Sequence, residues 1–352
     1  MPEIGSLFGH STDKRVFTED SSLPLSKCTI GIEIELENIG RRITPERNPA
    51  AEVFLDTDMR QNPPSLSATV SAAEAIRRVG IHTRPSGTRP PKSVQGLSYW
   101  DAKEDGSLRN NGVEYVSKKV FGLDINKALT EIEEFLDANH SPTMGPRTST
   151  HIHIDARNMD AQQLAVMTAL YVIVERVLFS QVHFSRKSSI FCVPLYSSLR
   201  NNALLMGVLR ADGASLPDVI ISRALKYTAY NLASLQTFGS IEFRHHHGEY
   251  RKGPLLKWIR LLLHLKRYAM YSGYATGMSG GTAGMICYAE DAPLKFINEV
   301  FRGELEPYSF LADHVYKGAS FARELMILAS NTKRGTCPSQ YCSYQTLKEE
   351  VK

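Results

Sequence analysis

Glutamate and histidine side chains alternate with aliphatic ones in short segments of this chain. The first segment is GIEIELE, residues 31–37, in which three glutamates alternate with three aliphatic residues. Successive side chains on a β-strand point to opposite faces, so Glu33, Glu35 and Glu37 would share one face, with neighbouring glutamates about 7 Å apart along the strand. We therefore predict a strand at 28–37 with an acidic face and an aliphatic face.

Three later segments repeat this alternation. Glu114 lies in GVEYVS, His151 and His153 lie in THIHID, and Glu242 and Arg244 lie in SIEFR. If the apolar sides of all four strands pack on one layer of helices, their polar sides form a common face. That face would carry Glu33, Glu35, Glu114, His151, His153, Glu242 and Arg244.

Such a face favours a site for divalent cations. Any one of these strands alone is typical of a solvent-exposed sheet, but solvent faces usually carry Lys, Thr and Gln rather than Glu and His. Carboxylates gathered on one face repel one another, and burying them without partners is unfavourable. Divalent cations relieve both effects, and carboxylate oxygens with a few imidazoles suit Mg²⁺ or Mn²⁺. The sequence therefore predicts a metal site built on a sheet.

The order of elements indicates an α+β fold. Strands of a parallel sheet that is buried on both faces would be continuously apolar, whereas these strands are polar on one side. We therefore expect an antiparallel sheet with helices packed on one face and with Trp100 and Trp258 as core anchors. Strands are expected at 28–37, at two places within 99–120, at 148–158 and at 239–250, and helices at 67–80, 124–140, 160–182, 254–272, 291–303 and 318–330.

Length and composition are those of a globular protein with a sizeable core. The chain has 352 residues, of which 42% are hydrophobic and 22% charged. Its net charge of +4 is spread too thinly to indicate a nucleic-acid partner. We expect a flexible arm at 1–24, a single catalytic domain at 25–330 and a C-terminal tail of uncertain order at 331–352.

The sequence indicates neither a membrane nor an oxidising compartment. The most apolar stretch, 164–179, contains Glu175 and Arg176 and predicts a buried helix rather than a membrane span. The N-terminus lacks an apolar segment typical of a secretory signal. The five cysteines are odd in number and scattered, and even Cys337 and Cys342 are interpreted as unrelated thiols. We therefore expect a cytoplasmic protein.

In chain order, E-x-E, GVE-x-VS, T-H-x-H and I-E-F-R resemble the motifs of a known superfamily. It comprises the carboxylate–amine ligases of the glutamine synthetase and γ-glutamylcysteine synthetase type, and the amidoligase branch is the most similar. The resemblance runs from residue 31 to about residue 250. It implies a strongly curved antiparallel sheet that forms a funnel lined by metal ligands, with helices packed behind it.

The resemblance also implies a reaction and its cofactors, ATP and Mg²⁺ (or Mn²⁺). ATP would phosphorylate a substrate carboxylate, and an amine would then displace phosphate from the acyl phosphate to form an amide. The substrates would be a small-molecule or peptide carboxylate and an amine. The sequence names neither substrate and does not show the oligomeric state.

By resemblance, two metal sites map onto the predicted polar face. Glu33 with His151 and Glu242 would hold the metal that bridges the ATP phosphates. Glu35 and Glu114 would hold a second metal near the acceptor carboxylate. The third ligand of this second metal is left open among Asp105, Glu37 and Glu104.

The remaining implied roles concern phosphate. Arg244 would neutralise the transferred phosphoryl group and His153 would lie near the nucleotide, so that the catalytic residues are Glu33, Glu242 and Arg244. Phosphoryl transfer needs positioning and charge neutralisation rather than a covalent nucleophile. The sequence has no Walker A loop and no G-x-G-x-x-G motif, so nucleotide binding would depend on the metal-lined funnel.

Two other functions remain open. A single-metal hydrolase or oxygenase would use His151, His153 and Glu242 around one metal. It would leave Arg244 and the remaining carboxylates without a role. A non-catalytic binding protein could also keep the fold, because fold alone does not determine function.

Further residues could contact the substrates. His246 follows Arg244 by two positions, so we expect it on the same face of its strand. The segment 183–238 carries no motif and is expected to shape specificity. Four arginines could line the mouth of the site: Arg109, Arg147, Arg157 and Arg200.

Overall fold

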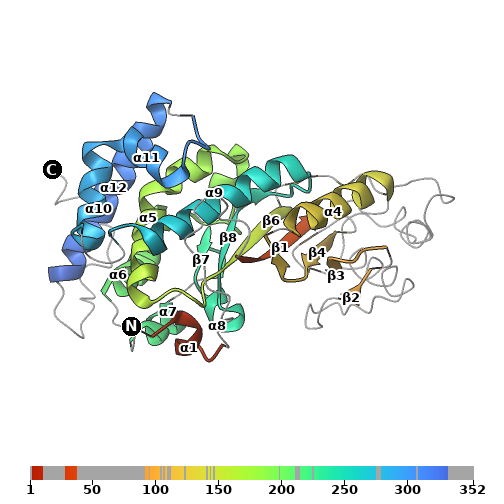
Figure 1. Ribbon diagram of the computed structural model, residues 1–352, viewed down its shortest axis with the longest axis horizontal. Coiled ribbons are helices and arrows are strands. Elements are labelled where there is room, and N and C mark those ends of the chain that lie inside the picture. The colour runs from red at the N-terminus through yellow and green to blue at the C-terminus, as the bar shows by residue number, and fades with distance from the viewer. Residues whose placement is uncertain are drawn as a thin grey trace.

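One antiparallel sheet organises the part of the chain that the structure describes. The structure is a computed structural model that describes residues 2–10, 28–37, 92–94, 96–103, 105, 108, 112–122, 124–139, 142, 144, 145, 147–197, 199–210, 215–223, 226–274, 279–306 and 308–331. The strand order is β2-β3-β4-β1-β6-β8-β7, with β5 also paired to β1, and the described strands do not close into a barrel (Figure 1). The strands are β1 (Thr29–Leu36), β2 (Lys92–Ser93), β3 (Trp100–Lys103), β4 (Val113–Ser117), β5 (Val120–Phe121), β6 (Ser149–Asp155), β7 (Tyr230–Asn231) and β8 (Ser240–His247).

The predicted alternation of apolar and polar residues is confirmed in the central strands. Ile32 of β1 lies directly opposite Ile152 of β6, which in turn lies opposite Phe243 of β8. All three side chains are fully buried. Their register joins the apolar sides of three strands into one continuous surface, which must pack against another layer.

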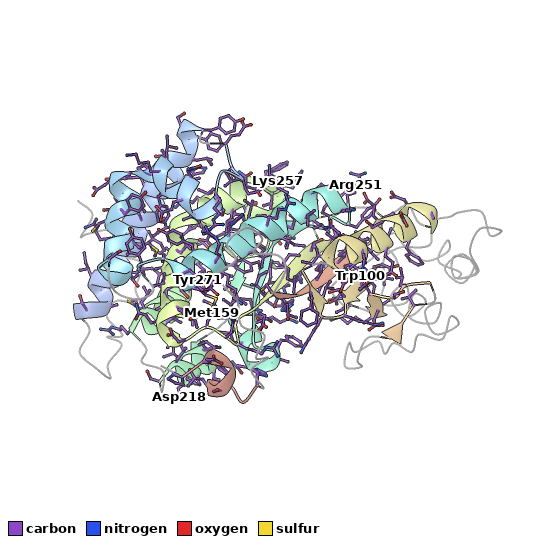
Figure 2. The ribbon with its side chains drawn as sticks, in the orientation of Figure 1. Trp100, Met159, Asp218, Arg251, Lys257 and Tyr271 are labelled. Atoms are coloured by element: carbon purple, nitrogen blue, oxygen red, sulfur yellow. The ribbon has the colours of Figure 1, made fainter. Side chains whose placement is uncertain are left out.

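Three helices cover this apolar surface: α4 (Ile125–Asn139), α5 (Ala161–Ser180) and α9 (Lys252–Tyr271) (Figure 1). Trp100, labelled in Figure 2, donates its ring N–H to the carbonyl of Ala128 in α4 at 2.8 Å. The ring of Tyr171 in α5 lies 6.1 Å from that of Phe243, and Trp258 of α9 is buried. The α+β class and the layer of helices on one face are thus as predicted.

Helix α5 is the central helix of the core. Asp160 and Gln163 form a capping box at its start, in which each side chain accepts the other residue's backbone N–H at 2.8–2.9 Å. By length and composition α5 could cross a membrane, but 83% of its apolar window is buried inside the fold. The prediction of a buried helix here is confirmed.

Three C-terminal helices, α10 (Gly281–Asp291), α11 (Pro293–Phe301) and α12 (Ser309–Asn331), pack against α5 and α9 (Figure 1). Helix α12 passes so close to α5 that a side chain at Gly318 would overlap the carbonyl oxygen of Ile173. The sequence did not predict α10, whose glycines disfavour a helix, and it began α12 too late. Packing against neighbouring helices stabilises both segments.

The remaining described elements are helices of 3 to 12 residues. They are α1 (Ile4–Leu7), η3 (Phe184–Ser188), η4 (Leu195–Ser197), α6 (Leu199–Arg210), α7 (Leu216–Arg223) and α8 (Ser234–Phe238). Ile4 is fully buried and its N–H donates to the carbonyl of Met159 at 2.7 Å. Residues 2–10 are therefore packed against the domain, unlike the flexible arm predicted for 1–24. The predicted helix at 67–80, Cys337 and Cys342 lie outside the described residues.

A buried hydrogen-bond chain joins β8 to α5 on the helical side of the sheet. The Tyr171 hydroxyl donates to Glu175 at 2.8 Å, and its oxygen lies 2.8 Å from Nε2 of His245. The backbone N–H groups of Leu195 and Tyr196 donate to the same carboxylate at 2.7 and 3.3 Å. Burial raises the pKa of Glu175 to about 7, although these hydrogen bonds favour the charged form.

This raised pKa predicts a pH-dependent stability. In the unfolded chain Glu175 would titrate near 4.5, so between about pH 4.5 and pH 7 the folded state binds the extra proton. The free energy of unfolding should therefore fall, as pH rises through this window, by on the order of 3 kcal/mol. Urea unfolding of the wild type and Glu175→Gln at several pH values measures this, because only the wild type carries the titrating group.

The difference in unfolding free energy, variant minus wild type, should increase from pH 5 to pH 8. The same measurement on Glu134→Gln, an exposed glutamate of α4, should show no such increase. A constant difference for Glu175→Gln would contradict the assignment.

Candidate active site

The register of the sheet brings the predicted polar residues onto one face. Glu33 lies directly opposite His151, and His153 lies opposite Glu242. On the other side of β1, Glu35 lies opposite Glu114. Like charges directly opposite each other destabilise a sheet, so the last pair needs a neutralising partner.

The ligand atoms fall into two groups of three. Glu33, His153 and Glu242 form the first group, and in each group the three ligand atoms lie within 4.8 Å of one another. Glu35, Asp105 and Glu114 form the second group. Among the three candidates for its third ligand, the structure thus places Asp105 there. Glu37 is buried at the end of β1 outside these groups, and Glu104 lies outside the described residues.

His151 occupies the centre between the two groups. Its Nδ1 lies 3.2 Å from Glu33, 3.5 Å from Glu242 and 3.9 Å from Glu35. Its Nε2 lies 2.8 Å from the hydroxyl of Ser149, which also donates to Glu35. The resemblance implied His151 as the partner of Glu33 and Glu242, and its Nδ1 lies near both carboxylates; the structure also brings His153 into a ligand group with them.

Polar neighbours orient the first group. Asn231 of β7 donates its amide to Glu242 at 2.6 Å, and the hydroxyl of Ser240 lies 3.0 Å from Nδ1 of His153. The other ring nitrogen of His153, Nε2, is buried without a hydrogen-bond partner among the described residues and lies 3.5 Å from Glu33. A buried nitrogen in this state, facing two carboxylates, fits a metal ligand.

The carboxylates of the first group are held in the charged form. Burial favours the neutral form of Glu33, but the adjacent imidazoles of His151 and His153 stabilise its charge and hold the pKa of Glu33 well below its usual range. Burial opposes the charge on Glu242 too, and the adjacent Arg244 guanidinium lowers its pKa. The nearby Glu33 in turn raises the pKa of His153 against the effect of its burial.

In the second group, burial opposes the negative charge of Glu35 and Glu114 more strongly than the nearby cations support it. Burial raises the pKa of Glu35, and it raises the pKa of Glu114 well above its usual range with a further contribution from Glu33. These carboxylates hold protons at pH values where exposed ones would not. A bound cation would remove this penalty.

Arg244 lies next to both His151 and Glu242. Its guanidinium donates to Glu242 and to the carbonyl of Phe191 at 3.1 Å, and it lies 3.4 Å from Nδ1 of His151. The buried Arg186 of η3 donates in turn to the backbone carbonyl of Arg244 at 2.9 Å. The position of Arg244 is thus fixed from both its side chain and its backbone.

The prediction that His246 shares the face of Arg244 is wrong. A register shift between Thr150 and Ile152 interrupts the pairing of β6 with β8, so that His246 lies opposite Thr150. Its ring lies 5.7 Å from that of Trp258 in α9, on the helical side. A bulge of this kind reverses the facing of the residues after it, so His246 packs in the core.

A cavity of about 310 Å³ opens beside the first group. Glu33 and His153 form part of its wall. The opposite strand position, Gly31, leaves room for the histidine, because a Cβ there would lie only 3.3 Å from the Cβ of His153. The cationic and aromatic side chains in its lining are Lys103, Lys119, Arg157 and Phe238.

Of the four arginines expected at the mouth, Arg157 lies in the cavity wall. It is paired with Asp155 at 2.8 Å. Arg147 is exposed. The side chain of Arg200 and the whole of Arg109 lie outside the described residues.

Sequence reasoning missed three residues that contact the site: Lys103, Ser149 and Asn231. Lys103 pairs with Glu114 at 2.8 Å. Pairing the two strands predicted within 99–120 could have identified Lys103, because it lies directly opposite Glu114 on the neighbouring strand. Asn231 lies in a two-residue strand, which gives no periodic signal.

The fold and the two carboxylate groups define an α+β protein built around an acidic sheet face. The chain belongs to the family described as “Putative amidoligase enzyme”, whose model matches residues 26–266. The matched range includes both groups and Arg244. The chain is thus a member of a ligase family, as the motifs predicted.

A comparison with solved structures finds Plasmodium falciparum glutamine synthetase, at a TM-score of 0.31 and 10% sequence identity, over 88% of this chain and 74% of that chain. A search of curated protein sequences found no match.

Proposed function

We propose that the protein is an ATP-dependent ligase that joins a carboxylate to an amine through an acyl phosphate. Family membership supports an amide-forming ligase. The observation that carries the proposal is that two three-residue metal-ligand groups share one sheet face with Arg244. A single-metal hydrolase or oxygenase would have no use for the second group.

The residues present fit Mg²⁺ or Mn²⁺. Glu33, His153 and Glu242 would hold one cation, and the free Nε2 of His153 supports this assignment. The second group, Glu35 with Asp105 and Glu114, offers hard oxygen ligands only. Bound cations would supply charge neutralisation at the phosphates and at the acceptor carboxylate.

The chain's own residues supply position and charge. The planar guanidinium of Arg244 can donate hydrogen bonds to two phosphoryl oxygens, which favours transfer of that group. His151 donates to Glu33 and separates the two acidic groups. The cavity beside His153 would bind the nucleotide, with the cationic side chains of its wall facing the phosphates.

In the proposed reaction a carboxylate oxygen attacks the γ-phosphorus of ATP and ADP leaves. The amine nitrogen then attacks the acyl carbon, phosphate leaves, and the amine loses a proton. Neither step needs a protein nucleophile. Catalysis would come from positioning and electrostatic stabilisation.

We further propose that residues 25–330 act as one catalytic domain in the cytoplasm, on a small-molecule or peptide carboxylate. Phe191 and Tyr227, from the motif-free segment 183–238, lie near Arg244; the Tyr227 ring is 5.7 Å from its guanidinium carbon. They are the first candidates for residues that shape specificity.

Thermal unfolding with and without nucleotide tests the proposal. ATP with Mg²⁺ should raise the melting temperature, because a ligand that binds only the native state stabilises it. Addition of a panel of carboxylates and amines should then release phosphate only when both substrates are present. Stabilisation by Fe(II) without any effect of ATP would instead support the single-metal alternative.

A further inference from the structure

Lys103 is an internal cation of the acidic sheet face. It lies on β3 directly opposite Glu114, and its ammonium is 2.8 Å from that carboxylate. Glu33 and Asp105 also act on it electrostatically. The Glu114 side chain is only 3% exposed, whereas that of Lys103 is 27% exposed and so retains a path to solvent.

The register places Lys103, Glu114 and Glu35 in one row across three strands. Two buried carboxylates therefore face each other, with an ammonium at one end of the row. A cation held by the second group would use an oxygen of Glu114, the carboxylate that Lys103 now contacts. The lysine and a metal ion thus compete for the same negative charge.

Lys103 also lines the 310 Å³ cavity beside Glu33 and His153. Its ammonium can therefore face either Glu114 or this cavity. Lys119 and Arg157 lie in the same lining, together with the carboxylates of Glu33 and Asp155. With Lys103, the cations outnumber the carboxylates, which favours an anionic ligand such as a polyphosphate. A lysine displaced from Glu114 would there find an anionic partner.

We propose, on the basis of the ligase function above, that Lys103 neutralises the second carboxylate group until a divalent cation replaces it, and that it then turns to the nucleotide phosphates. This makes the second cation weakly bound in the absence of nucleotide. It also couples cation and nucleotide binding, because each favours the same position of the lysine.

Titration of the full-length protein with Mn²⁺, with free Mn²⁺ followed by electron paramagnetic resonance, tests the proposal without any activity assay. Lys103→Met should tighten the weaker Mn²⁺ site about tenfold, the effect expected from removing one competing charge at contact distance. The same variant should bind a non-hydrolysable ATP analogue with Mg²⁺ several-fold more weakly. Lys103→Arg, which keeps the charge, should bind Mn²⁺ as the wild type does.

Lys119→Met is the matched control, because it removes a charge from the same cavity without contacting Glu114. It should leave Mn²⁺ binding unchanged. If Lys103→Met does not fold, Lys103→Gln keeps a donor to Glu114 without the charge and should also bind Mn²⁺ more tightly.

Mn²⁺ affinity that is unchanged or weaker in the uncharged Lys103 variants would overturn the proposal. This result is distinguishable from failure of the ligase function. If the protein is not an ATP-dependent ligase, ATP with Mg²⁺ will not stabilise the wild type. The Mn²⁺ affinities of the Lys103 variants would still show whether the lysine competes with the cation.

Discussion

Replacement of Glu33 or Glu242 by glutamine is expected to lower ATP-dependent amide formation by at least about 10³-fold. Both carboxylates belong to the first ligand group, and an amide is a weaker ligand than a carboxylate for a hard cation. The rate of phosphate release from ATP, measured with the substrate pair found by screening, gives the effect. Mn²⁺ binding to the stronger site should be lost in parallel.

These variants must also be compared for stability. The ionised form of Glu33 is favoured in the folded state, and Glu242 neutralises the buried Arg244. We therefore expect Glu33→Gln and Glu242→Gln to fold with reduced stability, rather than to gain from relief of repulsion. Glu134→Gln, at an exposed position of α4, is the control and should retain full activity. Full activity in both site variants would show that the ligand assignment is wrong.

Replacement of Arg244 by glutamine is expected to lower the turnover rate by about 10³-fold, with a much smaller effect on nucleotide affinity. The guanidinium is positioned by Glu242 and by the Phe191 carbonyl. A charge that acts on the transferred phosphoryl group is most important in the transition state. Steady-state kinetics with varied ATP separates the two effects.

Arg251→Gln provides the comparison, because Arg251 is exposed at the start of α9 (Figure 2). It should behave as the wild type. A variant of Arg244 with unchanged turnover and weaker ATP binding would assign this arginine to ground-state binding instead.

The sequence predicted the site well where strands alternate regularly. The two-residue period placed Glu33, Glu35, Glu114, His153 and Glu242 on one face, and the structure has them there. Only one face of these strands packs against helices, so a shift of register would turn the charged side chains into the apolar core. This physical constraint makes the pattern informative.

The sequence was less informative where geometry depends on tertiary contacts. The predicted facing of His246 was wrong because the register shift between Thr150 and Ile152 is not visible in the alternation of the sequence. The second group could not be completed because Asp105 follows the strand and belongs to no periodic pattern. The partner of Glu242, Asn231, comes from a strand too short to be predicted.

The most direct test of the central claim is anomalous scattering from crystals grown with Mn²⁺ and a non-hydrolysable ATP analogue. We predict one manganese peak among Glu33, His153 and Glu242, in contact with the analogue's phosphates, and a second peak among Glu35, Asp105 and Glu114. Manganese found only at other carboxylates, or an analogue bound away from this sheet face, would contradict the claim that these strands build the site of an ATP-dependent ligase.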